Sequence, residues 1–345
     1  MKILAVEHAV PATAYSNQAI IDRVTTASRG VLSHNEIQHT QRWLADLFGA
    51  YGSENRFISD GRERPIDLLV DAARRALDTA GVSARDLDFI LFGGVSRGFL
   101  VPSSASAVQH ALGASGVTCF DVLDACASWL RCLQVANGLF ATDAGKLGLV
   151  VNCESGFFDD PRVWEIKNVD DLEHLGGTFT IGEAATATVL AKTDDESKPD
   201  FYSYSFGEYG DLAVFPLRDV RRYSQLAAMP LEHMLFHTRS SELMTRGFRV
   251  WMDCVRNDDP LNGETVDVMV PHSGAARMID VVMRTGKISA KTIVKTFSDY
   301  GNTIAASIPL GMSIASKDGR LNRGDKLFVA TVAAGISIVS AQLVY

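Results

Sequence analysis

Cys126 stands where an apolar run that reads as a strand, residues 117–123, meets a helical pattern of apolar residues. The first N–H groups of a helix are unpaired, and the helix dipole is positive there. A sulfur at this junction is therefore expected to be stabilised as a thiolate and to act as a nucleophile. Free cysteine also packs commonly as a small buried apolar side chain. The junction alone leaves both interpretations open.

Two other polar residues have the same position relative to predicted strands and helices. His272 follows the apolar run 266–271, and Asn302 lies between Gly301 and a helix of small residues. In open α/β sheets, reactive groups collect at the carboxyl ends of strands and at the starts of the following helices. A lone histidine there is more often structural, and Gly-Asn is often only a turn. Because three such signals occur together, we interpret Cys126, His272 and Asn302 as one catalytic site.

Apolar strands that alternate with helices are predicted along the whole chain. Continuous apolar runs are typical of strands covered by helices on both faces. The strands are predicted at 2–6, 86–95, 117–123, 146–152, 266–271 and 326–333. Helices are predicted from near residue 18, over 66–77, over 102–112 and after Cys126, with a helix and loops over the site entrance within 30–64.

The charged, proline-ended stretch 193–199 divides the chain near its middle. Strands and helices follow a similar order on either side of it, which indicates an internal duplication. We therefore predict two halves: 1–195, which carries the cysteine, and 196–345, which carries the histidine and the asparagine.

Composition and charge exclude several classes of protein. The 345 residues, 47% hydrophobic and 21% charged, are ordinary for a soluble enzyme with a large core. A formal net charge of −8 argues against a general nucleic-acid binder. Five cysteines without C-x-x-C spacing argue against a disulfide framework or a zinc site, and a reducing cytoplasm is expected. No apolar stretch approaches the roughly 18 residues that cross a bilayer, so no membrane association is expected.

Three motifs resemble those of β-ketoacyl-ACP synthase III and its relatives in the thiolase superfamily. They are Asp124–Ser128, Pro271–Ala275 and Gly301–Pro309, of which the last is the most specific. The resemblance spans nearly the whole chain, because 52–57, 102–112 and 318–326 also look like that family. It implies a five-layered αβαβα fold made of two similar halves. It also implies a homodimer whose partner contributes to the acyl pocket around Leu100 and Val101.

The resemblance also implies a role for each site residue. Cys126 would attack an acyl thioester and carry the acyl group. His272 and Asn302 would donate hydrogen bonds to the thioester carbonyl of a malonyl-type or β-ketoacyl extender, where charge develops during a decarboxylative Claisen condensation. The backbone N–H groups of Cys126 and Ala334 match the family's oxyanion hole. No metal or cofactor is implied, because thioesters of CoA or acyl carrier protein are the substrates.

Binding residues are carried over in the same way. Trp43 would stack on the adenine of CoA, and Arg249 and Arg277 match the family's basic face for the carrier protein. Arg218, Arg221 and Arg222 would extend that face. An ordinary solvated surface is the competing interpretation for these arginines.

The chain departs from the family's motifs at several positions. Ser273, Gly274 and Ala275 stand where Gln, Ala and Asn usually follow the histidine. Residues 336–338 replace aromatic residues, and 181–185 replaces the usual Phe-Gly-Asp-Gly-Ala. These departures indicate a specialised relative from secondary metabolism, acting in polyketide or fatty-acid-like biosynthesis, rather than a housekeeping initiator of fatty-acid synthesis.

Other activities on the same scaffold stay open or are disfavoured. An acyltransferase that passes the acyl group from Cys126 to an alcohol or amine would use the same thioester chemistry. Asn302 favours condensation, whereas the altered residues after His272 favour simple transfer. A degradative thiolase would need a second cysteine near the C-terminus, and the last one here is Cys254. A non-catalytic partner subunit is disfavoured because all three catalytic positions are filled.

Overall fold

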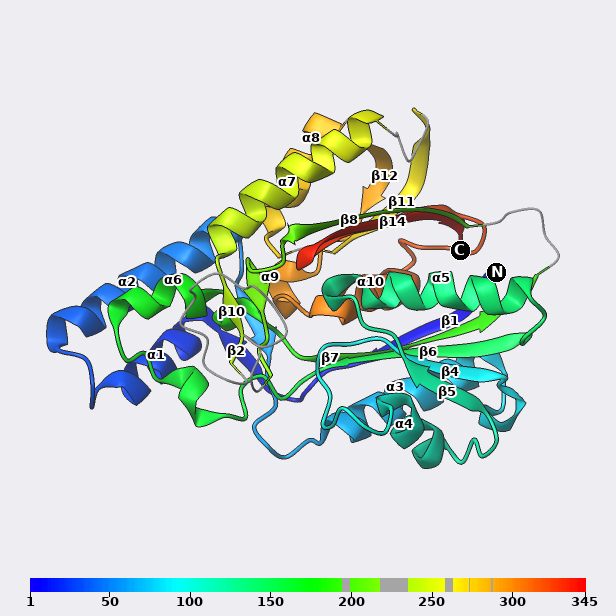
Figure 1. Cartoon of the computed structure of the whole chain (residues 1–345), viewed down its shortest axis with the longest axis horizontal. Helices are drawn as coiled ribbons and strands as arrows, with labels where there is room; N and C mark the ends of the chain where they lie inside the picture. The colour runs from blue at the N-terminus through cyan, green and yellow to red at the C-terminus, as the bar shows by residue number, and fades with distance from the viewer. Residues whose placement is uncertain (194–198, 218–234, 258–262, 273, 287) are drawn as a thin grey trace.

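Two five-stranded sheets form the frame of the computed structural model, which describes the chain except residues 194–198, 218–234, 258–262, 273 and 287 (Figure 1). The first sheet has the strand order β1-β7-β6-β4-β5. Its strands are β1 (Lys2–Ala9), β4 (Phe89–Phe92), β5 (Thr118–Asp121), β6 (Leu147–Glu154) and β7 (Ala184–Ala191). The second has the order β12-β11-β13-β14-β8. Its strands are β8 (Asp200–Tyr209), β11 (Thr265–Pro271), β12 (Ser289–Ile293), β13 (Lys326–Ala333) and β14 (Gly335–Val344).

The two sheets share one topology. In the first, β4 pairs in parallel with β5 and β6, while β7 is antiparallel to β6 and β1. In the second, β11 pairs in parallel with β12 and β13, while β14 is antiparallel to β13 and β8. Each strand of one sheet therefore has a counterpart at the same place in the other, which confirms the predicted duplication. The exact boundary at 195/196 lies within the residues that are not described and stays a prediction.

Helices occupy three layers around these sheets (Figure 1). The outer helices α3 and α4 pack on the first sheet, and α7 and α8 pack on the second. The central helices α5 and α10 lie between the sheets. Their bounds are α3 (Pro65–Ala80), α4 (Ser104–Leu112), α5 (Ser128–Ala141), α7 (Ser240–Asn257), α8 (Ala276–Gly286) and α10 (Ser307–Lys317). The order helix, sheet, helix, sheet, helix is the five-layered αβαβα architecture expected from the sequence.

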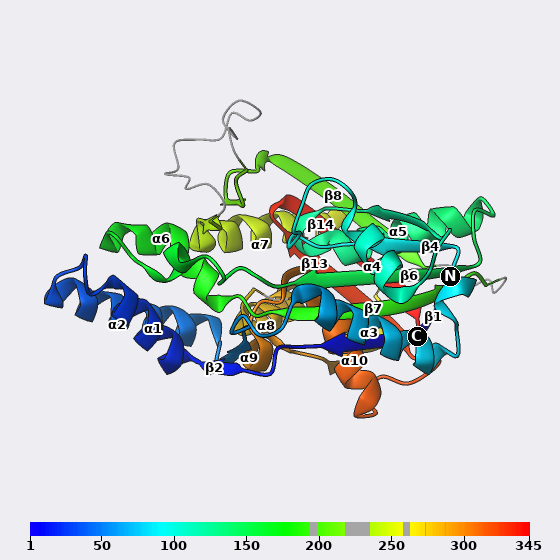
Figure 2. The same ribbon diagram turned by 90° about the horizontal axis from the view of Figure 1, so that it is seen from below.

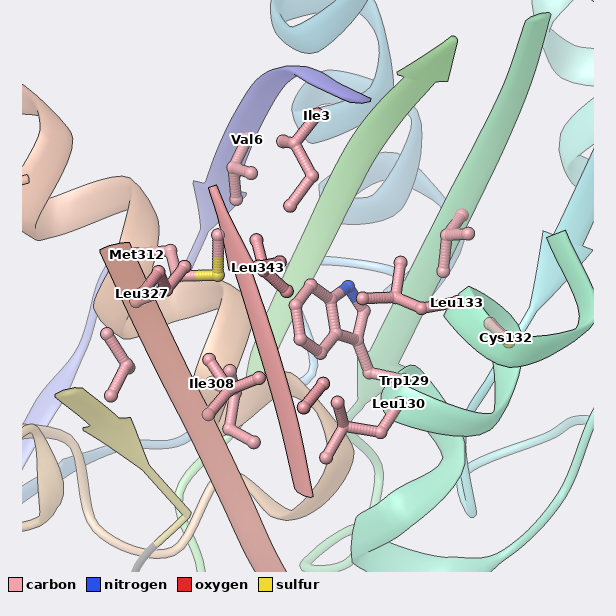
Figure 3. Packing of buried hydrophobic residues seen from close by; sticks show 14 of the residues in the cluster. Ile3, Val6, Trp129, Leu130, Cys132, Leu133, Ile308, Met312, Leu327 and Leu343 are labelled. Carbon is pink, nitrogen blue, oxygen red and sulfur yellow. The ribbon is translucent and has the colours of Figure 1, made fainter. Parts of the chain in front are cut away.

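The central layer joins the two sheets through one apolar cluster (Figure 3). Trp129 on α5 and Met312 on α10 belong to one cluster with Ile3 of the first sheet and Leu327 of the second. The indole nitrogen of Trp129 donates to Thr188 Oγ1 on β7 at 3.0 Å. Because burial of one large apolar side chain stabilises by about 1.5–3 kcal/mol, this layer fixes the starts of α5 and α10 firmly.

A third group of elements extends from one end of the layers, opposite the end at which both termini lie (Figures 1 and 2). It includes α1 (Asn17–Ser28), α2 (His34–Tyr51), α6 (Leu172–Leu175) and α9 (Phe297–Tyr300), with the small strands β2 (Ala14–Ser16), β3 (Asn55–Phe57), β9 (Ala213–Val214) and β10 (His237–Thr238). Helix α2 starts at a capping box between Ser33 and Glu36 and ends at Gly52 in the left-handed region. In the described part of the chain no helix is long and apolar enough to cross a membrane.

Candidate active site

A cavity of about 230 Å³ brings together Cys126, His272, Asn302 and Ala334. Cys126 follows β5 and precedes α5, and His272 follows the last residue of β11. Asn302 precedes α10, and Ala334 connects β13 to β14. The starts of both central helices therefore meet the ends of strands from both sheets at one point.

The turn that presents Cys126 is tight and strained. Residues 125–127 form a single 3-10 turn, and α5 itself begins only at Ser128. Ala125 has φ 45°, a left-handed conformation that costs a residue with a Cβ atom about 1–2 kcal/mol. Ser128 Oγ closes the turn, since it accepts the N–H of Asp124 at 2.8 Å and donates to the carbonyl of Ala125 at 2.7 Å.

Asp124 connects this turn to the second sheet. Its carboxylate accepts from Arg131 Nε at 2.7 Å and from Ser337 Oγ at 2.9 Å. Ser337 is one of the residues that replace aromatic side chains in the resemblance. The polar residue at 337 thus links the turn at Cys126 to β14 through a hydrogen bond to Asp124.

The thiol of Cys126 is not the thiolate that the sequence position predicts. Burial raises its pKa to about 12, and the negative charges of Glu154 and Asp124 act in the same direction. The backbone N–H groups of Cys126 itself and of Ala334 lower this pKa, but by less than burial raises it. The thiolate prediction is wrong in the resting enzyme because loss of hydration outweighs the helix start. A nucleophilic role for Cys126 would therefore require a base.

These two N–H groups are the pair expected to form an oxyanion hole. Both donate hydrogen bonds to the Cys126 sulfur. If an acyl group is bound to that sulfur, both N–H groups are therefore near its carbonyl oxygen and can donate to it. Gly335, which follows Ala334, has φ 119°, a conformation open to glycine. The chain can turn there from β13 into β14 and leave the N–H of Ala334 facing the cavity.

His272 is held as a neutral imidazole. Its backbone N–H donates to the carbonyl of Ala330 on β13 at 2.8 Å. Its ring Nδ1 lies 2.7 Å from Ser307 Oγ at the start of α10. Burial lowers the pKa of the imidazole to about 4, so the ring is uncharged at neutral pH. Nε2 is the nitrogen that remains for chemistry in the cavity.

Asn302 is held by the segment that precedes β7. Its backbone N–H donates to the carbonyl of Thr180 at 2.8 Å, and its carbonyl accepts the N–H of Gly182 at 3.1 Å. A Cβ atom at Gly182 would lie 1.8 Å from the carbonyl oxygen of Tyr300, so only glycine fits. The first half of the chain thus positions a residue of the second.

The carboxamide of Asn302 has one defined orientation. Its Oδ1 accepts the backbone N–H of Ile304 at 3.0 Å, which leaves the NH2 group for the cavity. Ile304 adopts φ 49°, which is unusual for a β-branched residue. Strained residues therefore stand beside both Cys126 and Asn302.

Two buried carboxylates that the sequence analysis missed support the loops near the site. Glu154, at the end of β6, accepts the N–H groups of Val95 at 3.0 Å and Ser96 at 3.1 Å. Burial raises its pKa to about 7. Glu183 accepts the N–H groups of Ser59 at 2.8 Å and Gly156 at 2.9 Å. In the sequence, an acidic residue directly at one end of an apolar strand is the signal that points to them: Glu154 ends β6 and Glu183 precedes β7.

Beyond Cys126, His272 and Asn302 the wall of the cavity is mainly apolar, and α7 and α8 supply much of it. Its residues are Leu243, Met244, Gly247, Phe248, Trp251, Met278, Ile279 and Val282. The sequence analysis missed this wall as well. Helical spacing of apolar residues over 243–251 is the signal that could have found it.

The predicted acyl and CoA contacts lie outside this cavity. The ring of Trp43 on α2 packs against Gly176, where a Cβ atom would lie 2.3 Å from it. Leu100 and Val101 are 64% and 84% exposed and do not line the cavity of their own chain. Arg249 and Arg277 are exposed on α7 and α8. Arg218, Arg221, Arg222 and Ser273 lie outside the described residues.

Comparisons with known proteins show which sequences this chain resembles. Residues 257–345 match the family described as 3-oxoacyl-[acyl-carrier-protein (ACP)] synthase III C terminal. The β-ketoacyl-[acyl-carrier-protein] synthase III of Laribacter hongkongensis is 27% identical over 349 residues, which cover 100% of this chain and 99% of that protein. The corresponding protein of Alkalilimnicola ehrlichii is 29% identical over 314 residues, which cover 90% of this chain and 92% of its own.

Solved structures show the same fold. The 3-oxoacyl-[acyl-carrier-protein] synthase III of Aquifex aeolicus VF5 has a TM-score of 0.79 at 22% identity, with 100% of this chain and 99% of that chain covered. A variant of Xanthomonas campestris OleA with bound lauric acid and lauroyl-CoA has a TM-score of 0.82 at 20% identity, with 99% and 98% covered. The chain is thus similar over nearly its whole length to β-ketoacyl-ACP synthase III, as its motifs indicate, it shares the layered fold of these solved structures, and by this resemblance it is an acyltransferase.

Proposed function

We propose that this enzyme transfers an acyl group from a thioester to Cys126 and condenses it with a malonyl-type thioester that loses carbon dioxide. The observation that carries this proposal is the cavity in which one thiol, one neutral imidazole, one carboxamide NH2 and two backbone N–H groups converge. Each of these groups meets one requirement of the two half-reactions.

Loading is the first half-reaction. The sulfur of Cys126 forms a bond to the thioester carbon, and its proton passes to His272. The N–H groups of Cys126 and Ala334 stabilise the oxyanion, which then collapses and expels the donor as a thiolate. One oxyanion donor is typically worth about 3–4 kcal/mol, so the backbone at Ala334 matters as much as a side chain.

Decarboxylation is the start of the second half-reaction. The bond between the malonyl carboxylate and the α-carbon breaks, and its electron pair forms an enolate. Donors from Asn302 and His272 stabilise the negative charge on the enolate oxygen more than the ground-state carbonyl. The α-carbon then bonds to the acyl carbon on Cys126, and the sulfur leaves and regains a proton.

Thioesters of CoA and of acyl carrier protein are the proposed substrates, with no further cofactor. Arg249 and Arg277 are exposed next to Phe248 and Met278, which line the cavity. Their charges would therefore meet a phosphate or an acidic carrier as the thioester enters. The apolar wall from α7 and α8 would bind an alkyl chain, which OleA also binds as lauric acid.

A specialised role in secondary metabolism and a homodimeric assembly complete the proposal. The chain differs from the family at 181–185, 273–275 and 336–338, and of these residues Ile181, Gly274 and Ala275 line the cavity. Leu100 and Val101 expose large apolar side chains, with Phe99 and Leu123 also exposed. A second copy of the chain would cover these side chains. Leu100 and Val101 of each copy would then contribute to the acyl pocket of the other.

Transfer to an alcohol or amine is the alternative, because a neutral His272 could also deprotonate a hydroxyl. The test incubates the enzyme with a panel of acyl thioesters and isotopically labelled malonyl thioesters. An acyl mass on Cys126, labelled carbon dioxide and a β-ketoacyl product are expected, and Cys126→Ala should lose the mass adduct. If the acyl-enzyme instead forms an ester or an amide and no carbon dioxide is released, the activity is simple acyl transfer and not condensation.

A further inference from the structure

The hydroxyl of Ser307 lies between two groups that compete for its one proton. Its Oγ is 2.7 Å from Nδ1 of His272 and 2.9 Å from the carbonyl oxygen of Ile304. The side chain is buried, with 4% of the residue exposed, at the first position of α10. No water is needed to explain either contact, because both are direct.

A hydroxyl donates once and accepts twice, which decides between the two neutral forms of the imidazole. If Nδ1 carries the proton, His272 donates to Ser307, and Ser307 donates to Ile304. His272 Nδ1, the Ser307 hydroxyl and the Ile304 carbonyl then each have a hydrogen-bond partner. If Nε2 carries the proton, Ser307 must turn to Nδ1 and gives up its bond to the carbonyl. The first form keeps one more hydrogen bond than the second and is therefore favoured.

We propose that Ser307 is a positioning residue that fixes His272 as the Nδ1–H tautomer and leaves Nε2 as the acceptor for the proton of Cys126. Nothing in the sequence motifs assigns this role to Ser307. The catalytic consequence rests on the proposed acyl transfer, whereas the tautomer itself does not.

The proton balance of the reaction follows from this assignment. During loading, the proton of the Cys126 thiol moves to Nε2, and the departing thiolate takes a proton from solvent. His272 then holds a proton at both ring nitrogens, and Nε2 donates a hydrogen bond, without transfer of the proton, to the enolate oxygen, whose negative charge offsets the cost of the buried imidazolium. When the condensation product leaves, the Cys126 thiolate recovers the same proton from Nε2. The histidine therefore donates in the second half-reaction a proton that it received in the first.

The same helix offers a matched control. Ser313 lies on α10, and its Oγ is 2.8 Å from Nδ1 of His8, away from the cavity. Ser313→Ala removes the same kind of contact from the same helix and should leave activity unchanged. Ser307→Thr retains the hydroxyl at the test position.

The tautomer can be measured directly by NMR of the protein labelled with ¹⁵N in histidine, with the His272 signals assigned from a His272→Gln variant. Wild type should show Nδ1 protonated and Nε2 bare. Ser307→Ala should move His272 toward the Nε2–H form, while Ser313→Ala should change only His8. A wild-type resting enzyme with Nε2 protonated would overturn the proposal.

The kinetic test measures the single-turnover rate of acyl loading and the rate of alkylation of Cys126 by iodoacetamide. Ser307→Ala should slow both by about 10- to 100-fold, as loss of a partner that orients a histidine typically does. Ser307→Thr should restore the rates and the Nδ1–H tautomer together. Native rates in Ser307→Ala, or slow loading in a Thr variant with the native tautomer, would refute the role. If the tautomer and the loading rates behave as expected but no carbon dioxide is released, only the proposed condensation is contradicted, and the role of Ser307 stands.

Discussion

The backbone N–H of Ile304 donates to Oδ1 of Asn302 at 3.0 Å and thereby turns the carboxamide NH2 toward the cavity. This hydrogen bond arises within a strained turn, since Ile304 has φ 49°. The strain has a functional consequence, because it gives Asn302 one orientation before substrate arrives. A donor that is already oriented need not reorganise in the transition state.

Replacement of Asn302 should therefore separate the two half-reactions. Asn302→Ala should load Cys126 at a near-native rate but release carbon dioxide about 100- to 1,000-fold more slowly, the typical effect of one lost oxyanion donor. Asn302→Asp should be at least as slow, because a carboxylate repels the enolate. Intact-protein mass and release of labelled carbon dioxide measure the two steps. Decarboxylation at the native rate in Asn302→Ala would refute the assignment.

Gly301 should be needed to place Asn302. It has φ 69°, and a Cβ atom there would lie 2.7 Å from the carbonyl oxygen of Thr180. Gly301→Ala should lower the free energy of unfolding by about 1–3 kcal/mol and slow decarboxylation as strongly as Asn302→Ala. Gly319→Ala is the control, since Gly319 has φ 79° and a Cβ atom there would meet nothing within 4 Å beyond its chain neighbours. Gly319→Ala should lower the free energy of unfolding by only about 1 kcal/mol and leave the rate of decarboxylation unchanged.

The raised pKa of Cys126 gives its reactivity a distinctive pH dependence. Burial is the main cause, with Glu154 and Asp124 adding to it, and the pKa is about 12. The rate of alkylation at Cys126 should therefore keep rising with pH through pH 10 in the resting enzyme, as the thiolate fraction grows. Peptide mass spectrometry after timed quenching measures this rate. A plateau below pH 9 would restore the low pKa expected from the helix start.

Acid should destabilise the fold through His8. Its pKa is lowered from 6.5 to about 4, first by burial and then by the charges of Lys317 and Arg75. Between these values the unfolded chain binds a proton that the folded chain excludes, so stability falls as the pH decreases from 6.5 to 4. The contribution is about 3 kcal/mol by linkage. His8→Gln should reduce this fall in denaturant unfolding at pH 7 and pH 4.5; an unchanged fall would show that His8 is not responsible.

The sequence predicted the layered fold and the three residues that meet in the cavity, because both depend on local patterns. Alternating apolar runs and helical repeats fix the layers, and Cys126, His272 and Asn302 stand at motif positions. The pKa of Cys126 could not be predicted in this way. It depends on how deeply the thiol is buried and on Glu154, which lies at the end of another strand.

Interactions across the sheets were equally inaccessible to sequence reasoning. Ser337 reaches Asp124, and Thr180 reaches Asn302, between segments more than 100 residues apart. The apolar wall from α7 and α8 likewise requires knowledge of which helix face meets the second sheet. Local patterns predict elements and chemistry, whereas charge states and pocket walls depend on the packed structure.

Leu100 and Val101 should bind a second copy of the chain. They are 64% and 84% exposed, Phe99 in the same loop is exposed as well, and so is Leu123 in the loop after β5, which is unusual for large apolar side chains. Wild type should sediment as a dimer, and Val101→Glu should shift it toward monomer because a charge buried in an interface lacks a partner. Val31→Glu is the control, since Val31 is 50% exposed at another site and should leave the dimer intact. A wild-type monomer, or a Val101→Glu variant that remains dimeric, would place the interface elsewhere.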